Sequence, residues 1–323
     1  MARWHSLHIH YYDPQDALLV DAIAPLVHSE RGPCPSRWFF LRYWKQGPHI
    51  RLRLFLDDST ADGFLHTAQT TLREYLAIHP STNAPPDARL KEILETIAGL
   101  EGGQPQTQEL LPDNTLRFDR YEPEYEKYGG EIGVALAEDL FERSSELTLD
   151  LLSLIHGKPG QRFAVSFNMM LNGLRGAGLN EAGIADFLAT YSRFWSRYSS
   201  QLVNVDWQAD FDERKRKLSA SAAAILLDRL PTESPTGAAL ARWREIIRNA
   251  TQALESKADE ILPNVTMAGP NLTTAQRREF VWFNYLHTHN NRLGVMPAQE
   301  AYLAYLAHHV VCDLAGFKPQ PIP

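Results

Sequence analysis

Two arginines and one histidine have side chains and positions that suit chemistry on a carboxylate. Arg51 and Arg53 stand two positions apart in the stretch His-Ile-Arg-Leu-Arg-Leu of residues 49–54. Side chains alternate between the two faces of a strand, so a strand here would present both guanidinium groups side by side. A guanidinium group holds a carboxylate through two directional hydrogen bonds. A histidine such as His287 exchanges a proton near neutral pH and suits general acid–base catalysis.

Two further segments concentrate polar groups beside turn residues. Residues 121–130 are rich in tyrosine and charge and end in Gly129-Gly130, which permits a positive φ before a long helix. Residues 284–294 crowd amide, imidazole and guanidinium groups at the end of an expected helix. Plainer interpretations stay open for all three features: a solvated arginine face, an ordinary helix entry, and a helix end capped by its own side chains.

The N-terminal part of the chain must position the arginines, and its pattern predicts strands. Residues 4–12 alternate between polar and apolar side chains, and residues 37–44 and 49–56 flank a Lys-Gln-Gly-Pro turn that predicts a β-hairpin. Residues 116–121 predict another strand. Helices are expected from Pro14 to about His28 and over 60–98 with a break at 79–86, followed by an exposed loop at 101–105.

Beyond Gly130 the pattern is helical almost throughout. Helices are expected at 131–156, 160–175, 180–200, 207–229, 236–261, 273–287 and 297–315, with a connection at 231–237. This order predicts an α+β protein, in which antiparallel hairpin and sheet elements precede a large, mostly helical C-terminal half. Without a repeat or a long linker, we expect one compact unit, a single domain over residues 1–323.

Several familiar enzyme classes lack their motifs. The sequence contains no Walker A loop, nucleophile elbow, HExxH zinc motif or kinase signature. Residues 173–178 reverse the dinucleotide-binding glycine spacing and follow a helix, so they predict a helix end and a loop. Alternation places His5 on the face opposite His8 and His10, and no carboxylate stands nearby at ligand spacing. We therefore expect neither a metal nor a cofactor.

Composition narrows the partners and the compartment. The 323 residues carry a formal charge of −7 and a pI near 5.9, which argues against non-specific binding to nucleic acid or a membrane surface. Against that acidic background, Arg42, Arg51, Arg53 and Lys127 predict a local basic pocket for carboxylates. The two cysteines, Cys34 and Cys312, fit neither a disulfide framework nor a zinc site, and no apolar stretch is long enough for a signal peptide or a membrane span. A cytoplasmic protein is expected.

Four segments together resemble one family, which includes the C-terminal domain of lantibiotic dehydratases and related stand-alone thiopeptide biosynthesis proteins. They are the opening residues 4–12, the hairpin at 38–43 and 49–53, the Tyr-x-Pro-Glu segment at 121–130, and the His-x-x-x-Asn-Arg-Leu segment at 287–293. They occur in the family's order and span most of the chain.

The resemblance implies work on ribosomally made precursor peptides that carry a leader. In the family's elimination domains, a glutamyl ester on Ser or Thr loses glutamate and leaves dehydroalanine or dehydrobutyrine. A separate, much larger glutamyl-tRNA-dependent protein performs the glutamyl transfer, and 323 residues are too few for both activities. The chain is therefore expected to be the elimination half, with no direct contact to nucleic acid; whether it forms a homodimer is left open.

The same resemblance assigns roles to individual residues. Arg51 and Arg53 are expected to clamp the glutamyl carboxylates, His287 to move the proton, and Glu124 to orient an arginine or His287. With Lys127 these form the predicted catalytic set. The predicted substrate-binding set is Arg42, Tyr128, Asn291 and Arg292.

One departure from the family's pattern keeps two other functions open. Lys127 stands where the elimination pattern has arginine, and lysine keeps the charge but loses the planar fork. The first alternative is a pyridine synthase, which joins two dehydroalanines in a formal aza-[4+2] cycloaddition, closes the macrocycle and releases the leader peptide. The second is a non-catalytic module that holds the leader for a partner dehydratase by pairing with an open strand edge.

Overall fold

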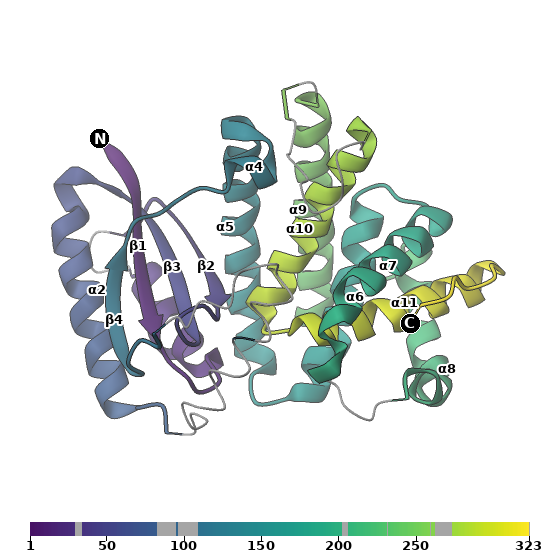
Figure 1. Cartoon of the computed structure of the whole chain (residues 1–323), viewed down its shortest axis with the longest axis horizontal. Helices are drawn as coiled ribbons and strands as arrows, with labels where there is room; N and C mark the ends of the chain where they lie inside the picture. The colour runs from purple at the N-terminus through teal and green to yellow at the C-terminus, as the bar shows by residue number, and fades with distance from the viewer. Residues whose placement is uncertain are drawn as a thin grey trace. The chain divides into compact units, whose positions relative to one another are not determined.

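A computed structural model of the chain shows an α+β protein, which confirms the predicted class (Figure 1). The structure describes residues 1–29, 34–82, 95, 109–201, 206–230, 232–258, 260–261 and 273–322. The chain divides into two compact units, one made of Met1–Pro123 with Thr148–His156, the other of Glu124–Leu147 with Gly157–Pro323. Each unit is described separately below, and the single domain over 1–323 stays a prediction.

The first unit is built on an antiparallel sheet with the strand order β2-β3-β1-β4. Its strands are β1 (Ala2–His10), β2 (Arg37–Tyr43), β3 (His49–Asp57) and β4 (Thr115–Asp119). The predicted hairpin is confirmed, since β2 and β3 pair in a register that sets Phe40 opposite Leu52. Gln46 and Gly47 in its turn both have positive φ, of 66° and 103°.

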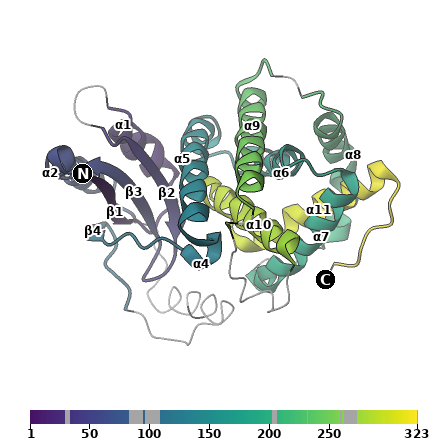
Figure 2. The same ribbon diagram turned by 90° about the horizontal axis from the view of Figure 1, so that it is seen from above.

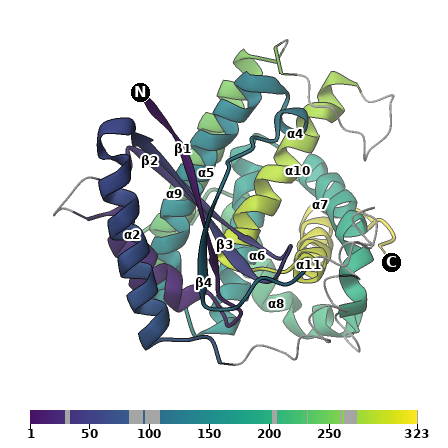
Figure 3. The same ribbon diagram turned by 60° about the vertical axis from the view of Figure 1, so that its left-hand side comes forward.

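One face of this sheet carries the hydrophobic core. Leu7, Ile9, Ile50, Leu52 and Leu54 alternate along β1 and β3 with no exposed surface. Helix α2 (Asp58–Ile78) covers this face along its length (Figure 3), and Asp57 caps its first turn by accepting a hydrogen bond from the Ser59 amide. The helix expected after Pro14 is present as a short π-helical turn η1 (Leu18–Ile23) that continues into α1 (Ala24–Val27). α2 ends at Ile78, where the break at 79–86 was predicted. The helix expected to continue to residue 98 and the loop at 101–105 lie almost wholly outside the described residues.

The second unit is helical, as predicted. Its helices are α4 (Tyr125–Tyr128), most of α5 (Gly130–Ile155), α6 (Pro159–Gly176), α7 (Glu181–Trp195), the 3-10 turn η2 (Ser196–Gln201), α8 (Trp207–Leu226), α9 (Pro235–Ser256), α10 (Thr274–Leu293) and α11 (Pro297–Ala315). Helix α11 packs against α6, α7 and α8, and α6 packs against α9 (Figure 2). α6 ends at Gly176, which confirms the helix end predicted for residues 173–178.

One helix boundary differs from the prediction in a way that matters for the site. The sequence predicted a helix over 273–287, but α10 continues to Leu293 and ends at Gly294, whose φ is 77°. The side chains of His287, Thr288 and Arg292 are therefore set by helical geometry, on two successive turns. The polar residues of this segment are held by tertiary contacts, which is why their low helix propensity did not end the helix.

Candidate functional site

The face of the sheet opposite the hydrophobic core carries Arg51 and Arg53, as the alternation predicted. Both lie on β3 with the partners His8 and Ser6 on β1 and Leu41 and Phe39 on β2. Arg53 is buried, and its Nη1 lies 3.1 Å from Nε2 of His8. Arg51 donates from Nε to Nε2 of His49 across 3.2 Å.

Aromatic rings flank both guanidinium groups. The Cζ atom of Arg51 lies 3.4 Å from the centroid of the Tyr43 ring, and that of Arg53 lies 5.2 Å from the centroid of the Tyr121 ring. The negative face of an aromatic ring attracts a cation at such distances. The two charges of this arginine face are thus held on aromatic surfaces.

Three buried histidines share this face. The rings of His8 and His49 stack with centroids 5.0 Å apart, and His10 lies 4.5 Å from His49. Burial, reinforced by the arginine charges, lowers the pKa of His8 to about 2, that of His49 to about 3 and that of His10 to about 4. All three imidazoles are therefore neutral near pH 7.

Arg42 does not join this face, which corrects its predicted place in a shared basic pocket. Its strand partner is Ile50, so its side chain points to the core side of the sheet. There it forms a largely buried ion pair with Asp16, with 2.7 Å between Nη2 and Oδ1. The sequence had already set Arg42 on the face of Trp38 and Phe40, and the structure supplies the acidic partner that the sequence did not identify.

Glu124 and Lys127 form a local ion pair in the second unit. The Lys127 Nζ atom lies 3.3 Å from both carboxylate oxygens of Glu124, one helical turn away. The pair is partly exposed: Lys127 has 29% of its side-chain surface exposed, and Glu124 has 57%. Lys127 thus carries a charge balanced by its neighbour.

Tyr128 and Arg292 are buried in the helical unit. The Arg292 guanidinium has no exposed surface, donates to Ser145 Oγ and to the Thr288 carbonyl at 3.0 Å each, and lies over the Phe141 ring. Burial lowers the pKa of Arg292 to about 9, so it remains charged near pH 7. The Tyr128 ring packs edge-on against the same Phe141. These contacts join α10 to α5. Arg292 was predicted to bind substrate, but it has no exposed surface through which it could contact one.

His287 has a buried carboxylate partner that the sequence did not identify. Its Nδ1 atom lies 2.9 Å from Oε1 of Glu300, which has no exposed surface. The other oxygen of Glu300 accepts hydrogen bonds from the Asn290 amide, at 3.1 Å, and from the Tyr191 hydroxyl. Burial and the Glu300 charge raise the pKa of Tyr191 well above its usual value, so this hydroxyl stays a donor. Both carboxylate oxygens of Glu300 therefore take part in hydrogen bonds.

The chain between α10 and α11 brings these groups together. Only three residues, Gly294 to Met296, separate the two helices, and Glu300 stands in the first turn of α11, where the helix dipole favours a negative charge. The His287 ring stacks on Trp195, with centroids 4.3 Å apart, and retains 23% of its side-chain surface exposed. With Nδ1 on a carboxylate, the ring is oriented, and Nε2 is the nitrogen suited to exchange a proton with a substrate.

The structure thus groups the predicted residues into separate clusters. Arg51 and Arg53 belong to the sheet unit, and the other predicted residues apart from Arg42 belong to the helical unit. Asn291 is half-buried near the end of α10, where its carbonyl accepts from the Gly294 amide. A glutamate within the apolar stretch of residues 297–312 was the available indication of Glu300, because an acidic residue on a buried helix normally has a partner.

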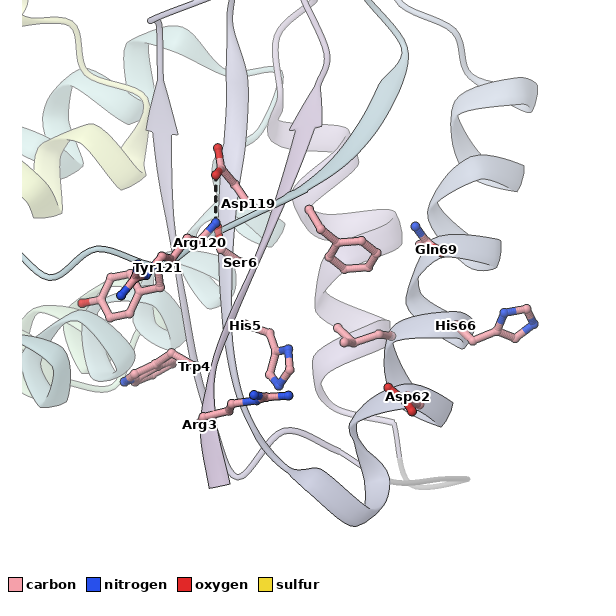
Figure 4. A pocket seen from close by; sticks show the side chains of 12 residues that line it. Arg3, Trp4, His5, Ser6, Asp62, His66, Gln69, Asp119, Arg120 and Tyr121 are labelled. Atoms are coloured by element: carbon pink, nitrogen blue, oxygen red, sulfur yellow. Dashed lines mark hydrogen bonds between the residues drawn. The ribbon is translucent and has the colours of Figure 1, made fainter. Parts of the chain in front are cut away.

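A cavity of about 720 Å³ opens elsewhere in the sheet unit (Figure 4). Its walls are formed by the start of β1, the end of β4 and the first half of α2. The lining residues include Arg3, His5, Asp62 and Phe118. In the described part of the chain, none of the predicted site residues lines it. Tyr121, which supports Arg53, forms part of its wall.

Comparisons with known proteins agree with the sequence motifs. The family model described as "Lantibiotic biosynthesis dehydratase C-term" matches residues 4–311. No curated protein matches this sequence. Within the described residues, no helix is long and apolar enough to cross a membrane.

Solved structures share the fold. The pyridine synthase TbtD from thiomuracin biosynthesis superimposes with a TM-score of 0.73 at 18% identity, over 97% of this chain and 99% of that one. TsrL gives a TM-score of 0.61 at 18% identity, over 99% and 100%. The tRNA-dependent lantibiotic dehydratase MibB from Microbispora sp. 107891 gives 0.59 at 21% identity, over 97% of this chain and 28% of its own.

Proposed function

This chain belongs to the family of lantibiotic biosynthesis dehydratase C-terminal domains, and from that premise we propose that it is a pyridine synthase-type enzyme of peptide natural product biosynthesis. In this proposal it joins two dehydroalanine residues of a ribosomally made precursor by a formal aza-[4+2] cycloaddition. Closure of the ring forms the macrocycle and releases the leader peptide. The sequence had favoured glutamate elimination, with cycloaddition as the alternative.

The observation that carries this proposal is the likeness to a pyridine synthase over nearly the full length of both chains. The dehydratase superimposes with a lower TM-score, 0.59 against 0.73. The arrangement of the cationic side chains also favours the pyridine synthase interpretation over glutamate elimination. Lys127 has no guanidinium group and pairs with Glu124, and Arg42 pairs with Asp16. Of the cationic residues predicted to bind a carboxylate, this leaves Arg51 and Arg53 on one face of the sheet.

The proposed reaction consists of two carbon–carbon bond formations and a series of proton transfers. An amide next to one dehydroalanine shifts its proton from nitrogen to oxygen, which gives a 2-azadiene. This diene adds across the alkene of the second dehydroalanine. Loss of the oxygen as water, and of the leader as a carboxamide, then leaves the aromatic pyridine. Atoms and electrons balance without an oxidant.

The helical unit offers the group that these proton transfers need. His287 can take up or release a proton at Nε2 while Glu300 holds Nδ1, an arrangement that fixes the orientation of the ring. Asn290 and Tyr191 hold the carboxylate in turn, so it is oriented before substrate binds. Arg51 and Arg53 contribute hydrogen-bond donors for peptide oxygens.

Glutamate elimination is the second candidate, and the arginine face is what favours it. Two guanidinium groups on one face of β3 suit a glutamyl ester, whose side-chain carboxylate is free. His287 would then remove the Cα proton as glutamate leaves. The partner would be a separate protein that loads glutamate from its tRNA onto the same precursor.

One experiment separates the candidates. The protein is incubated with a synthetic precursor peptide carrying two dehydroalanines and, separately, with the same sequence carrying glutamyl esters on serine, and products are followed by mass spectrometry. Cycloaddition predicts loss of water and of the leader carboxamide from the first peptide only. Loss of glutamate from the second peptide would favour elimination instead. Binding of both peptides without conversion would support the non-catalytic, leader-holding module.

A His287→Ala variant tests the assigned catalytic group. Removal of a general acid–base group lowers kcat by roughly 10²–10⁴-fold. The matched control is His66→Ala on the exposed side of α2, which should leave the rate unchanged. An equal rate for His287→Ala and the native protein would remove His287 from the mechanism.

A further inference from the structure

We propose that His8 and His49 are positioning residues, which fix the guanidinium groups of Arg53 and Arg51 by accepting hydrogen bonds as neutral imidazoles. The inference rests on the proposed function in one respect, namely that these arginines contact the substrate. The geometry of the four side chains carries the rest.

The contacts define which nitrogen of each imidazole carries the proton. A guanidinium group has only donors, so Nε2 of His8, 3.1 Å from Arg53, and Nε2 of His49, 3.2 Å from Arg51, must both be acceptors. His49 uses its other nitrogen, Nδ1, to donate to the Gly47 carbonyl across 2.8 Å. The proton of His8 is then on Nδ1, which lies 3.9 Å from Oδ2 of Asp119. Each ring is therefore locked in one tautomer.

Neutrality of the imidazoles is maintained by their surroundings. His8 and His49 are buried, and the neighbouring arginine charges add to the effect of burial in lowering the pKa of each ring. The stacked contact between them, with centroids 5.0 Å apart, keeps the acceptors of the two arginines in fixed relation. Tyr43 and Tyr121 then support the guanidinium groups from the side.

A neutral acceptor has a consequence that a carboxylate partner would not have. Asp16 neutralises Arg42 on the core side of the same sheet, which leaves that arginine little attraction for another anion. An imidazole orients a guanidinium group without cancelling its charge. The two imidazoles thus fix the direction in which Arg51 and Arg53 meet an oxygen or carboxylate of the peptide substrate, which lowers the entropy cost of binding.

The test compares His8→Gln with His8→Asn. Glutamine places its amide oxygen near the position of the histidine Nε2, whereas asparagine is one bond too short to reach Arg53. The side-chain nitrogen resonances of Arg53 are measured by NMR, together with kcat and KM for whichever of the two synthetic peptides the native protein converts. The exposed His66→Gln serves as the control.

We expect His8→Gln to keep the restricted Arg53 resonances and a KM within about threefold of native. In His8→Asn the Arg53 resonances should merge through free rotation, and KM should rise roughly tenfold, the effect of losing one hydrogen bond to a charged group, with kcat changed much less. A native KM in His8→Asn, or equal damage in both variants, would overturn the inference. If the native protein converts neither peptide, the proposed function fails, while the Arg53 resonances still decide whether His8 holds the arginine.

Discussion

The Nδ1 atom of His287 lies 2.9 Å from Oε1 of Glu300, a carboxylate with no exposed surface at the start of α11. A buried carboxylate needs partners for both oxygens, and here His287, Asn290 and Tyr191 provide them. The histidine thereby acquires a defined orientation. This relationship makes His287 the candidate catalytic group of the helical unit, and it leads to the first prediction.

Glu300→Gln should lower kcat by roughly 10²-fold or more while the protein still folds. Glutamine preserves the shape, but its NH₂ group can donate to Nδ1 of His287 and force the ring into the wrong tautomer. Turnover of the dehydroalanine peptide, measured beside a thermal melt, checks this. Glu138→Gln removes another buried carboxylate on α5 and serves as the control. Similar rates in the two variants would show that Glu300 has only a structural role.

Arg42→Gln should destabilise the protein without changing the reaction. It removes the ion-pair partner of the buried Asp16, and the expected loss is about 3 kcal/mol in the free energy of unfolding. KM and kcat of the folded fraction should stay native. Arg51→Gln should behave in the opposite way, with a raised KM and little loss of stability. Denaturant titration and steady-state kinetics on both variants decide the assignment, and a raised KM in Arg42→Gln would return Arg42 to the substrate site.

Stability should fall in mild acid through the buried histidines, and His10→Phe should reduce that loss. The pKa of His10 is lowered to about 4 by burial, against 6.5 in the unfolded chain, so the unfolded state binds a proton more readily between these pH values. Stability is therefore lost as pH falls from about 6.5 toward 4. For this one group the loss between pH 7 and pH 5 is about 2 kcal/mol.

The measurement for His10 is the free energy of unfolding at pH 7 and at pH 5. The difference between the two pH values should be about 2 kcal/mol smaller in His10→Phe than in the native protein. His66→Phe, on the exposed side of α2, should leave the difference unchanged. An unaltered difference in His10→Phe would mean that His10 is protonated in the folded protein.

Two glycines of α6 should respond oppositely to alanine. A Cβ atom at Gly176 would lie 2.8 Å from the backbone carbonyl oxygen of Arg244 on α9, which cannot move without shifting the helix. Gly176→Ala is expected to cost about 1–3 kcal/mol of unfolding free energy. At Gly160 a Cβ atom meets nothing within 4 Å, and alanine there should be neutral or stabilising by up to about 1 kcal/mol. Thermal or denaturant unfolding compares them, and equal losses would contradict the packing of α6 on α9.

Periodicity predicted the four strands and most of the described helices of this fold. The alternation of residues 49–56 placed Arg51 and Arg53 on one face, and Ile50, Leu52 and Leu54 on the other, as the structure shows. The helix predicted at 297–315 has the observed bounds. Such patterns are local, because burial of one face imposes the spacing directly on the sequence.

Partners distant in the sequence could not be predicted in the same way. Asp16 and Arg42 lie 26 residues apart, and Tyr191 and Glu300 lie 109 residues apart. No spacing rule relates such positions, since the contact depends on how whole helices and strands pack. The neutral state of His8 is likewise a property of its surroundings, because burial and two arginines determine it.

The three-residue connection from Gly294 to Met296 sets the rotational phase of α11 relative to α10. Each residue of an α-helix turns by about 100° about its axis, so one inserted or deleted residue before Pro297 would carry Glu300 away from His287. Substitutions in this connection can be tolerated where changes in its length cannot. Natural variation at this point should therefore preserve length even where the residue types differ.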